Sequence, residues 1–207
     1  MTATTEYLVD PLPFVLLTDG PAPECWSHDD DGVISASAPA RTDLFIDPAG
    51  KHPMSDAPRL LGTPEGDFQL SARVRVDFAA TFDAGVLAVF VDQQNWAKLC
   101  FEYTPQGTPS VVTVVTRGES DDANAFELSE NTVWLRISRT GTTFAFHASN
   151  DGKWWRLVRY FGLGQSSLDG STRVGFLAQS PTGEGCQIVF DQIDYRPEAP
   201  AGLRDGS

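Results

Sequence analysis

Alternation of apolar and polar residues with a period of two is the feature that most constrains the fold of this chain. Between Phe68 and Phe78 every second residue is apolar, and the residues between them are Gln, Ser, Arg, Arg and Asp. Because successive side chains of a strand point to opposite faces of the sheet, this pattern predicts a strand with one buried face. Similar runs occur at 85–91, 96–103, 111–117, 132–139, 143–149, 154–160, 172–178 and 187–195.

Turn-forming residues separate these runs, and no long segment carries the 3.6-residue stripe of an amphipathic helix. Thr140-Gly141 and Asp151-Gly152 each stand between two strand-like runs, which predicts hairpins. Shorter strands are expected at 14–17, 25–28, 33–37 and 43–46. Many short strands with turns between them predict an all-β sandwich or barrel, of which we favour a sandwich. We expect one domain over 1–207, with 1–10 and 197–207 loosely ordered.

Charge excludes several classes of partner. The 207 residues include 28 acidic and 15 basic side chains, a formal charge of −13, which repels phosphate backbones and anionic lipid headgroups. We therefore expect no nucleic acid and no membrane as a partner. The chain has no run of roughly 18 apolar residues, and its first six residues lack the regions of a secretory signal, so we expect a cytoplasmic protein.

Several segments resemble one family. They are GVLAVFVDQQNWAKLCFEY at 85–103, VVTRGESDD at 114–122, WLRISR at 134–139, SNDGKW at 149–154, RLVR at 156–159 and VGFLAQSPTG at 174–183. Together they resemble the concanavalin A-like domain of unknown function found in the regulation-of-enolase proteins, and the resemblance extends over about 26–195. The same sandwich is similar to the C-terminal accessory domain of some β-xylosidases. The resemblance implies a two-sheet antiparallel jelly roll of the concanavalin A-like lectin and glucanase type, without an established catalytic motif.

Polar residues that lie out of phase with the apolar face of each strand form a candidate ligand-binding set. In the strand at 96–103 the apolar phase leaves Trp96, Lys98, Cys100 and Glu102 on the other face. Applied to the remaining strands, this argument gives a concave face made by Trp96, Lys98, Glu102, Trp134, Arg136, His147 and Gln179. Aromatic surface beside donors and acceptors suits a carbohydrate or another small polar metabolite. The alternative is a solvated outer face with cross-strand ion pairs.

Metal and cofactor sites are weakly indicated. The carboxylates of Asp29, Asp30 and Asp31 stand in one loop, and calcium prefers such oxygen ligands. The loop lacks the alternating spacing of a dedicated calcium loop, and a plain turn explains it equally well. The three cysteines are widely spaced and outside any Cys-x-x-Cys pattern, which predicts reduced thiols. We assign no metal ligand and no cofactor.

Catalytic motifs are missing from the sequence. The Glu-x-Asp-x-Glu pattern of the glucanases with this fold is absent, and Asp191 and Asp194, three residues apart, are expected on opposite faces of a strand. Trp154 and Trp155 are neighbours in a predicted strand, so one is expected to point inward and the other outward. The favoured role of this pair is a structural clamp at the edge of the sandwich rather than stacking on a sugar.

Three hypotheses about function follow. The first is a non-catalytic binding or regulatory module that presents the concave face to a carbohydrate or small polar metabolite. The second is a lyase, isomerase or cyclase in which Lys98, Arg136 and His147 perform acid-base chemistry in the same cup. The third, which comes from the resemblance, is a protein-binding scaffold that regulates a metabolic enzyme.

Overall fold

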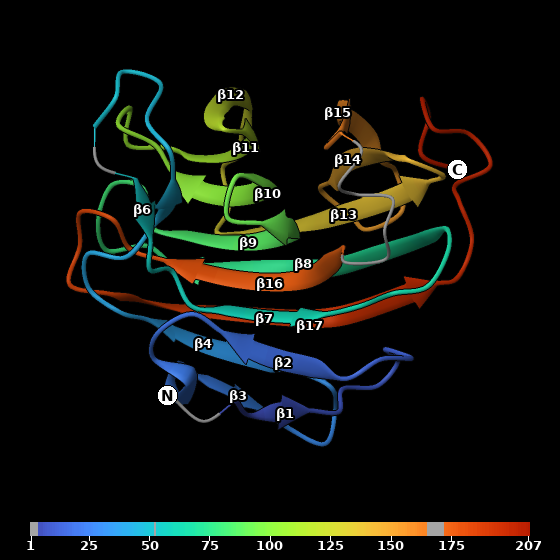
Figure 1. Ribbon diagram of the computed structural model, residues 1–207, viewed down its shortest axis with the longest axis horizontal. Helices are drawn as coiled ribbons and strands as arrows, with labels where there is room; N and C mark the ends of the chain where they lie inside the picture. Colours follow the sequence, from blue (N-terminus) through green and yellow to red (C-terminus); the bar gives the residue numbers. More distant parts are fainter. Residues whose placement is uncertain (1–3, 52, 165–171) are drawn as a thin grey trace.

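Two antiparallel sheets pack face to face in the computed structural model, which describes residues 4–51, 53–164 and 172–207 (Figure 1). The all-β sandwich expected from the alternation is therefore confirmed, and it has the concanavalin A-like form of two large sheets. Residues 1–3, part of the N-terminal stretch expected to be loosely ordered, lie outside the described residues.

Sheet A has eight strands, in the order β1 (Glu6–Tyr7), β2 (Leu16–Asp19), β7 (Arg59–Gly62), β16 (Arg173–Gln179), β9 (Ala84–Asp92), β10 (Asn95–Tyr103), β11 (Pro109–Arg117) and β12 (Glu119–Glu127). Sheet B has seven, in the order β15 (Arg156–Gly162), β14 (Thr143–Ser149), β13 (Thr132–Thr140), β8 (Phe68–Asp77), β17 (Cys186–Arg196), β4 (Ile34–Ala38) and β3 (Trp26–His28). A short 3-10 helix, η1 (Pro23–Cys25), precedes β3.

The main core lies between the two sheets. It is formed by the alternating apolar residues of both sheets, such as Leu70 and Val74 from β8 and Leu99 and Phe101 from β10. Gly85 allows the sheets to approach closely, because a Cβ at this position would lie 2.6 Å from a methyl group of Val74. The inner faces are therefore filled, and ligand sites are left to the outer faces.

A second apolar layer covers the outer face of sheet A. Its buried members include Trp96, Cys100 and Val112, and the segment around β5 (Leu44–Phe45) packs over them. This segment pairs with β6 (Met54–Ser55) in a separate two-stranded sheet. The apolar residues of the segment are buried by lying across sheet A, so residues 42–51 and 53–57 form a roof over part of that face. We call them the roof segment.

Some strands differ from those expected. The alternation predicted the central strands to within a few residues, but β7 and β12 were not predicted. β12 reads ESDDANAFE, and it lies at the edge of sheet A with most of its side chains exposed, so it has no apolar phase to detect. Trp154 and Trp155 were expected in a strand, but both precede β15. Their opposite orientations are as expected, because Trp154 is 74% exposed and Trp155 packs against the guanidinium of Arg136.

A bulge in β17 corrects the expectation for Asp191 and Asp194. Asp191 pairs with Arg73, whereas Asp194 pairs with Ser71, so three steps along β17 correspond to two along β8. The extra residue shifts the alternation by one position, and both carboxylates lie on the outer face of sheet B. Asp191 forms a two-pronged ion pair with Arg73, at 2.7 and 2.6 Å.

The C-terminal segment, 197–207, runs beside the outer face of sheet B near β13 and β14 (Figure 1). The carbonyl oxygen of Gly206 accepts a hydrogen bond of 2.6 Å from Nη2 of Arg136. The carbonyl oxygen of Leu203 lies 2.9 Å from Nε2 of His147. Main-chain groups of this segment thus cover two of the residues in the candidate set.

Candidate functional site

The seven residues of the candidate set lie on two opposite faces of the molecule. Four of them belong to the outer face of sheet A, namely Trp96, Lys98 and Glu102 from β10 and Gln179 from β16. The other three belong to the outer face of sheet B, namely Trp134 and Arg136 from β13 and His147 from β14. The expectation of one cup that contains all seven was wrong, although the phase predicted for each strand was correct. Ligand binding by these residues stays a prediction.

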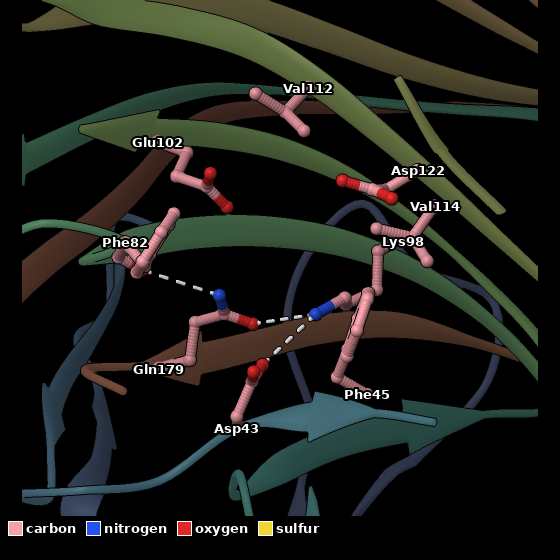
Figure 2. Close-up of a pocket in the computed structure, with 9 residues that line it drawn as sticks. All are labelled: Asp43, Phe45, Phe82, Lys98, Glu102, Val112, Val114, Asp122 and Gln179. Carbon is pink, nitrogen blue, oxygen red and sulfur yellow. Dashed lines mark hydrogen bonds and ion pairs between the residues drawn. The ribbon is translucent and has the colours of Figure 1, made fainter. Parts of the chain in front are cut away.

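A pocket of about 240 Å³ opens between the roof segment and the strands of sheet A (Figure 2). We call it the Lys98 pocket; its lining residues are Asp43, Phe45, Phe82, Lys98, Glu102, Val112, Val114, Asp122 and Gln179. The floor comes from neighbouring strands of one sheet, so its side chains converge because they share a face. Drug-sized ligands occupy cavities of roughly 300–1,000 Å³, so a smaller ligand fits here.

Lys98 is the only cation that lines this pocket within the described residues, and its side chain is 2% exposed. Its Nζ donates hydrogen bonds to Oδ1 of Asp43 at 3.1 Å and to Oε1 of Gln179 at 2.9 Å. Burial alone would lower the pKa of Lys98, but the carboxylates of Asp43 and Glu102 hold it above its ordinary value. Lys98 is therefore a charged group at neutral pH that links the roof segment to the floor.

Glu102 faces the same space from the far end of β10 (Figure 2). It is 9% exposed, and none of the described residues donates a hydrogen bond to its carboxylate. Burial raises the pKa of Glu102 to about 7; Lys98 acts in the opposite direction, and Asp43 and Asp122 add to the increase. Most polar groups in such an environment have a partner, and because Glu102 lines the pocket, a group bound there can supply its missing hydrogen bonds.

The aromatic surface of the pocket comes from residues that the strand pattern did not indicate. Trp96 is completely buried beneath the roof segment, with Nζ of Lys98 5.7 Å from its ring centre, so it supports the lysine and does not face a ligand. Phe45 from the roof segment and Phe82 from the loop before β9 line the pocket instead. Asp43 and Asp122 are further lining residues that strand phase could not place there.

The outer face of sheet B has its own pocket, of about 230 Å³. We call it the Arg136 pocket; its lining residues are Gln69, Ser71, Trp134, Arg136, Gly152, Trp155, Gln192, Asp194 and Arg196. The guanidinium of Arg136 lies over the ring of Trp155, 4.3 Å from its centre. The indole nitrogen of Trp134 donates to Oε1 of Gln192 at 3.1 Å.

His147 lies next to this second pocket but does not line it. The side chain is completely buried, and its Nε2 must donate to the carbonyl oxygen of Leu203, because a carbonyl only accepts. Nδ1 is then unprotonated and has no partner among the described residues. Burial lowers the pKa of His147 to about 4, and the charge of Arg136 acts in the same direction. A neutral, enclosed imidazole of this kind has a structural role in holding the C-terminal segment.

The other candidates have structural explanations. Oδ1 of Asp29 accepts hydrogen bonds from the backbone N–H groups of Asp31 and Val33, as in a plain turn, and the described residues contain no cluster of metal-binding side chains. Cys25, Cys100 and Cys186 are unpaired. Burial raises the pKa of Cys25 and of Cys186 to about 12, and it also raises that of Cys100, so none of these thiols is activated as a nucleophile.

The chain belongs to the family described as protein of unknown function (DUF1349), which matches residues 21–198. The resemblance to a concanavalin A-like family of unknown function is thereby confirmed at this level, whereas the link to enolase regulation stays a prediction. No curated protein matches the chain. No helix within the described residues is long and apolar enough to cross a membrane.

Solved structures share the fold. A functionally unknown protein from Saccharomyces cerevisiae is 20% identical with a TM-score of 0.77, over 91% of this chain and 97% of that one. A mutant of the GH43 protein BlXynB from Bacillus licheniformis is 17% identical with a TM-score of 0.68, over 92% of this chain but 37% of its own. An alginate lyase from Klebsiella pneumoniae is 15% identical with a TM-score of 0.51, over 83% of each chain. At these identities the likeness concerns the fold alone.

Proposed function

We propose that this protein binds a small, uncharged, hydroxylated ligand, such as a single sugar ring, in the Lys98 pocket. The observation that carries the proposal is the buried carboxyl group of Glu102, which faces the pocket without a hydrogen-bond partner among the described residues. A hydroxyl group both donates and accepts, so it satisfies Glu102 whether that carboxyl is protonated or ionised.

The rest of the lining suits the same class of ligand. Gln179 and Lys98 stand opposite Glu102, so polar groups are available on two sides of the space (Figure 2). Phe45 and Phe82 offer aromatic surface, which packs well against the C–H faces of a sugar ring. One lysine stands beside three carboxyl groups, and this acidic excess disfavours an anionic ligand.

Carbohydrate-related neighbours give limited support. The fold occurs in GH43 glycoside hydrolases and in an alginate lyase, and the chain corresponds to about a third of the GH43 protein BlXynB. One fold can carry many unrelated functions, so these neighbours make sugars a reasonable class of ligand to test but do not identify the ligand.

Calorimetric titration of the whole protein with xylose, arabinose, glucose and galactose tests the proposal. We expect saturable binding of at least one of these sugars, and we expect Glu102→Leu to weaken it about tenfold or more through the lost hydrogen bonds. Arg136→Gln, in the other pocket, is the matched control and is expected to bind normally. If none of these neutral sugars binds, or if Glu102→Leu binds them as well as the original protein, the proposal is wrong.

An enzyme is the second candidate, because a carboxyl group with a pKa of about 7 is suited to give and take protons near neutral pH. This candidate predicts that a bound sugar is converted on incubation, with a rate that changes through pH 7. It also predicts that Glu102→Gln stops the conversion while binding persists. NMR spectra of the sugar before and after incubation separate this candidate from the binding module.

A further inference from the structure

The Arg136 pocket differs from the Lys98 pocket in its charge. Arg136 is 5% exposed, and no carboxylate of the described residues lies within ion-pair distance of its guanidinium. Burial lowers the pKa of Arg136 to about 10, so the side chain remains protonated at neutral pH. Buried charges in proteins are normally paired, because an isolated charge loses its hydration without compensation. An unpaired buried guanidinium that lines a pocket therefore indicates a missing anion.

The hydrogen bonds of Arg136 point to the same conclusion. Its Nη2 donates to the carbonyl oxygen of Gly206, which is a neutral acceptor, and its Nε is buried without a partner among the described residues. No acceptor is assigned to Nη1 within the described part of the chain. The Nη1 edge is thus free to bind a planar anionic group. The contact with Trp155 fixes the plane of the guanidinium.

Two further polar side chains lie in the pocket with their hydrogen-bonding groups unused. Gln69 is 5% exposed and Ser71 is 8% exposed, and neither side chain has a hydrogen-bond partner within the described residues. At the rim, Arg196 forms an exposed ion pair of 3.1 Å with Asp194. The three titratable side chains that line the pocket, Arg136, Asp194 and Arg196, therefore leave one net positive charge. Amide and hydroxyl groups beside a cation suit a ligand that has both a carboxylate and hydroxyl groups.

We infer that the Arg136 pocket is a second binding site, for a small carboxylate-bearing ligand with a hydroxylated body, such as a sugar acid. The carboxylate lies on the Nη1 edge of Arg136, and the hydroxyl groups bond to Gln69 and Ser71. The site is independent of the proposed function, because it lies on the opposite sheet and selects an anionic ligand rather than an uncharged one. The C-terminal segment forms part of its construction, since Gly206 holds one edge of the same guanidinium.

The experiment is an NMR titration of the whole protein with glucuronate and galacturonate, with glucose and galactose as neutral counterparts. We expect the indole N–H signals of Trp134 and Trp155 to shift in a saturable way with at least one sugar acid, and not with the neutral sugar. The indole signal of Trp96, beneath Lys98, reports on the first pocket and is expected to stay constant with the sugar acid. Raised salt is expected to weaken the sugar-acid binding.

Variants separate recognition from folding. Arg136→Gln is expected to weaken sugar-acid binding at least tenfold, and Arg136→Lys, which keeps the charge but loses the planar fork, by a smaller factor. Arg196→Gln lies at the exposed rim and keeps the fold; it is expected to weaken binding about threefold. Glu102→Gln is the control in the first pocket and is expected to leave sugar-acid binding unchanged. The inference is overturned if neither sugar acid binds, if the neutral sugar shifts the same signals equally, or if folded Arg136→Gln binds normally.

Discussion

The two outer faces of the sandwich carry pockets of nearly equal size, about 240 and 230 Å³, that differ in how their central cation is compensated. Lys98 is paired with Asp43 and surrounded by further carboxyl groups, whereas within the described part of the chain Arg136 bonds only to a carbonyl oxygen and lies over the ring of Trp155. In the first pocket the cation is neutralised by nearby carboxyl groups, which leave a net negative charge. In the second pocket the buried cation is not neutralised, and the net charge is positive. Size alone therefore says little about the ligand, and the partner of the buried cation says more.

The two pockets are expected to differ most in the stability that is lost when the buried cation of each is replaced. Lys98→Met leaves the carboxylate of Asp43 without its partner, and breaking a buried ion pair costs about 3–5 kcal/mol of the free energy of unfolding. Arg136→Met removes a charge that has no ionic partner among the residues the structure describes, so it is expected to cost about 1 kcal/mol or less. Urea denaturation of both variants measures the contrast. Equal losses would show that Arg136 has an ionic partner that the structure does not reveal.

The pH dependence of stability is the next contrast. The pKa of Glu102 is raised to about 7, so its contribution to the free energy of unfolding is present below about pH 4.5 and is lost as the pH rises through 7. The pKa of His147 is lowered to about 4, so its contribution is present above about pH 6.5 and is lost as the pH falls through 4. The two groups change the free energy of unfolding in opposite directions as the pH rises. Each change amounts to about 3 kcal/mol over its own pH range.

Single variants should expose each slope. Glu102→Gln is expected to leave a protein that becomes more stable from pH 5 to 7, because the effect of His147 remains. His147→Asn is expected to leave one that becomes less stable over the same range, because the effect of Glu102 remains. Denaturation midpoints at pH 5, 6 and 7 decide this. A midpoint profile that keeps the same slope in both variants would contradict the assigned environments.

Deletion of the last residues is expected to have a smaller effect, and only on one face. Removal of 201–207 takes away the acceptors of Arg136 and His147, at a cost of about 2 kcal/mol for two hydrogen bonds, one of them to a charged group. The fluorescence of Trp155 is expected to change, because this residue contacts both Arg136 and the segment. Binding in the Lys98 pocket is expected to stay the same, and a loss of that binding would show that the faces are coupled.

The smallest effect is expected at the exposed ion pairs. Arg41→Gln breaks a pair with Glu184 that is largely exposed, and it is expected to change the free energy of unfolding by about 0.5 kcal/mol or less. The same small change is expected for Arg196→Gln, although Arg196 lines the Arg136 pocket. Thermal denaturation of both checks this, and a large loss for Arg196→Gln alone would indicate a structural role for the rim of the Arg136 pocket.

The sequence predicted local features well because alternation is a local property. It placed Lys98 and Glu102 on one face of β10 and Arg136 on the outer face of β13, as the structure has them. It could not assign these strands to different sheets, because strand order depends on pairings between distant segments. The bulge at Asp191–Asp194 was invisible for a related reason, since an extra residue changes the phase without changing the composition.

The roof segment shows the other limit of prediction. Asp43 was expected in a short strand, but nothing near it in the sequence indicates that it meets Lys98, 55 positions later. The contact arises because the apolar side chains of Leu44 and its neighbours are buried by packing against sheet A. Residues of this kind become recognisable only when the long-range packing is known.

The separation of roof and floor in the Lys98 pocket has a consequence for how such a protein diversifies. The floor is built into sheet A and is fixed by the sandwich core behind it, whereas Asp43 and Phe45 belong to a stretch inserted between β4 and β7. Changes in that stretch can alter what the pocket selects without disturbing the scaffold. Exchange of residues 42–57 between family members is therefore expected to transfer ligand preference, as loop grafting does between antibodies.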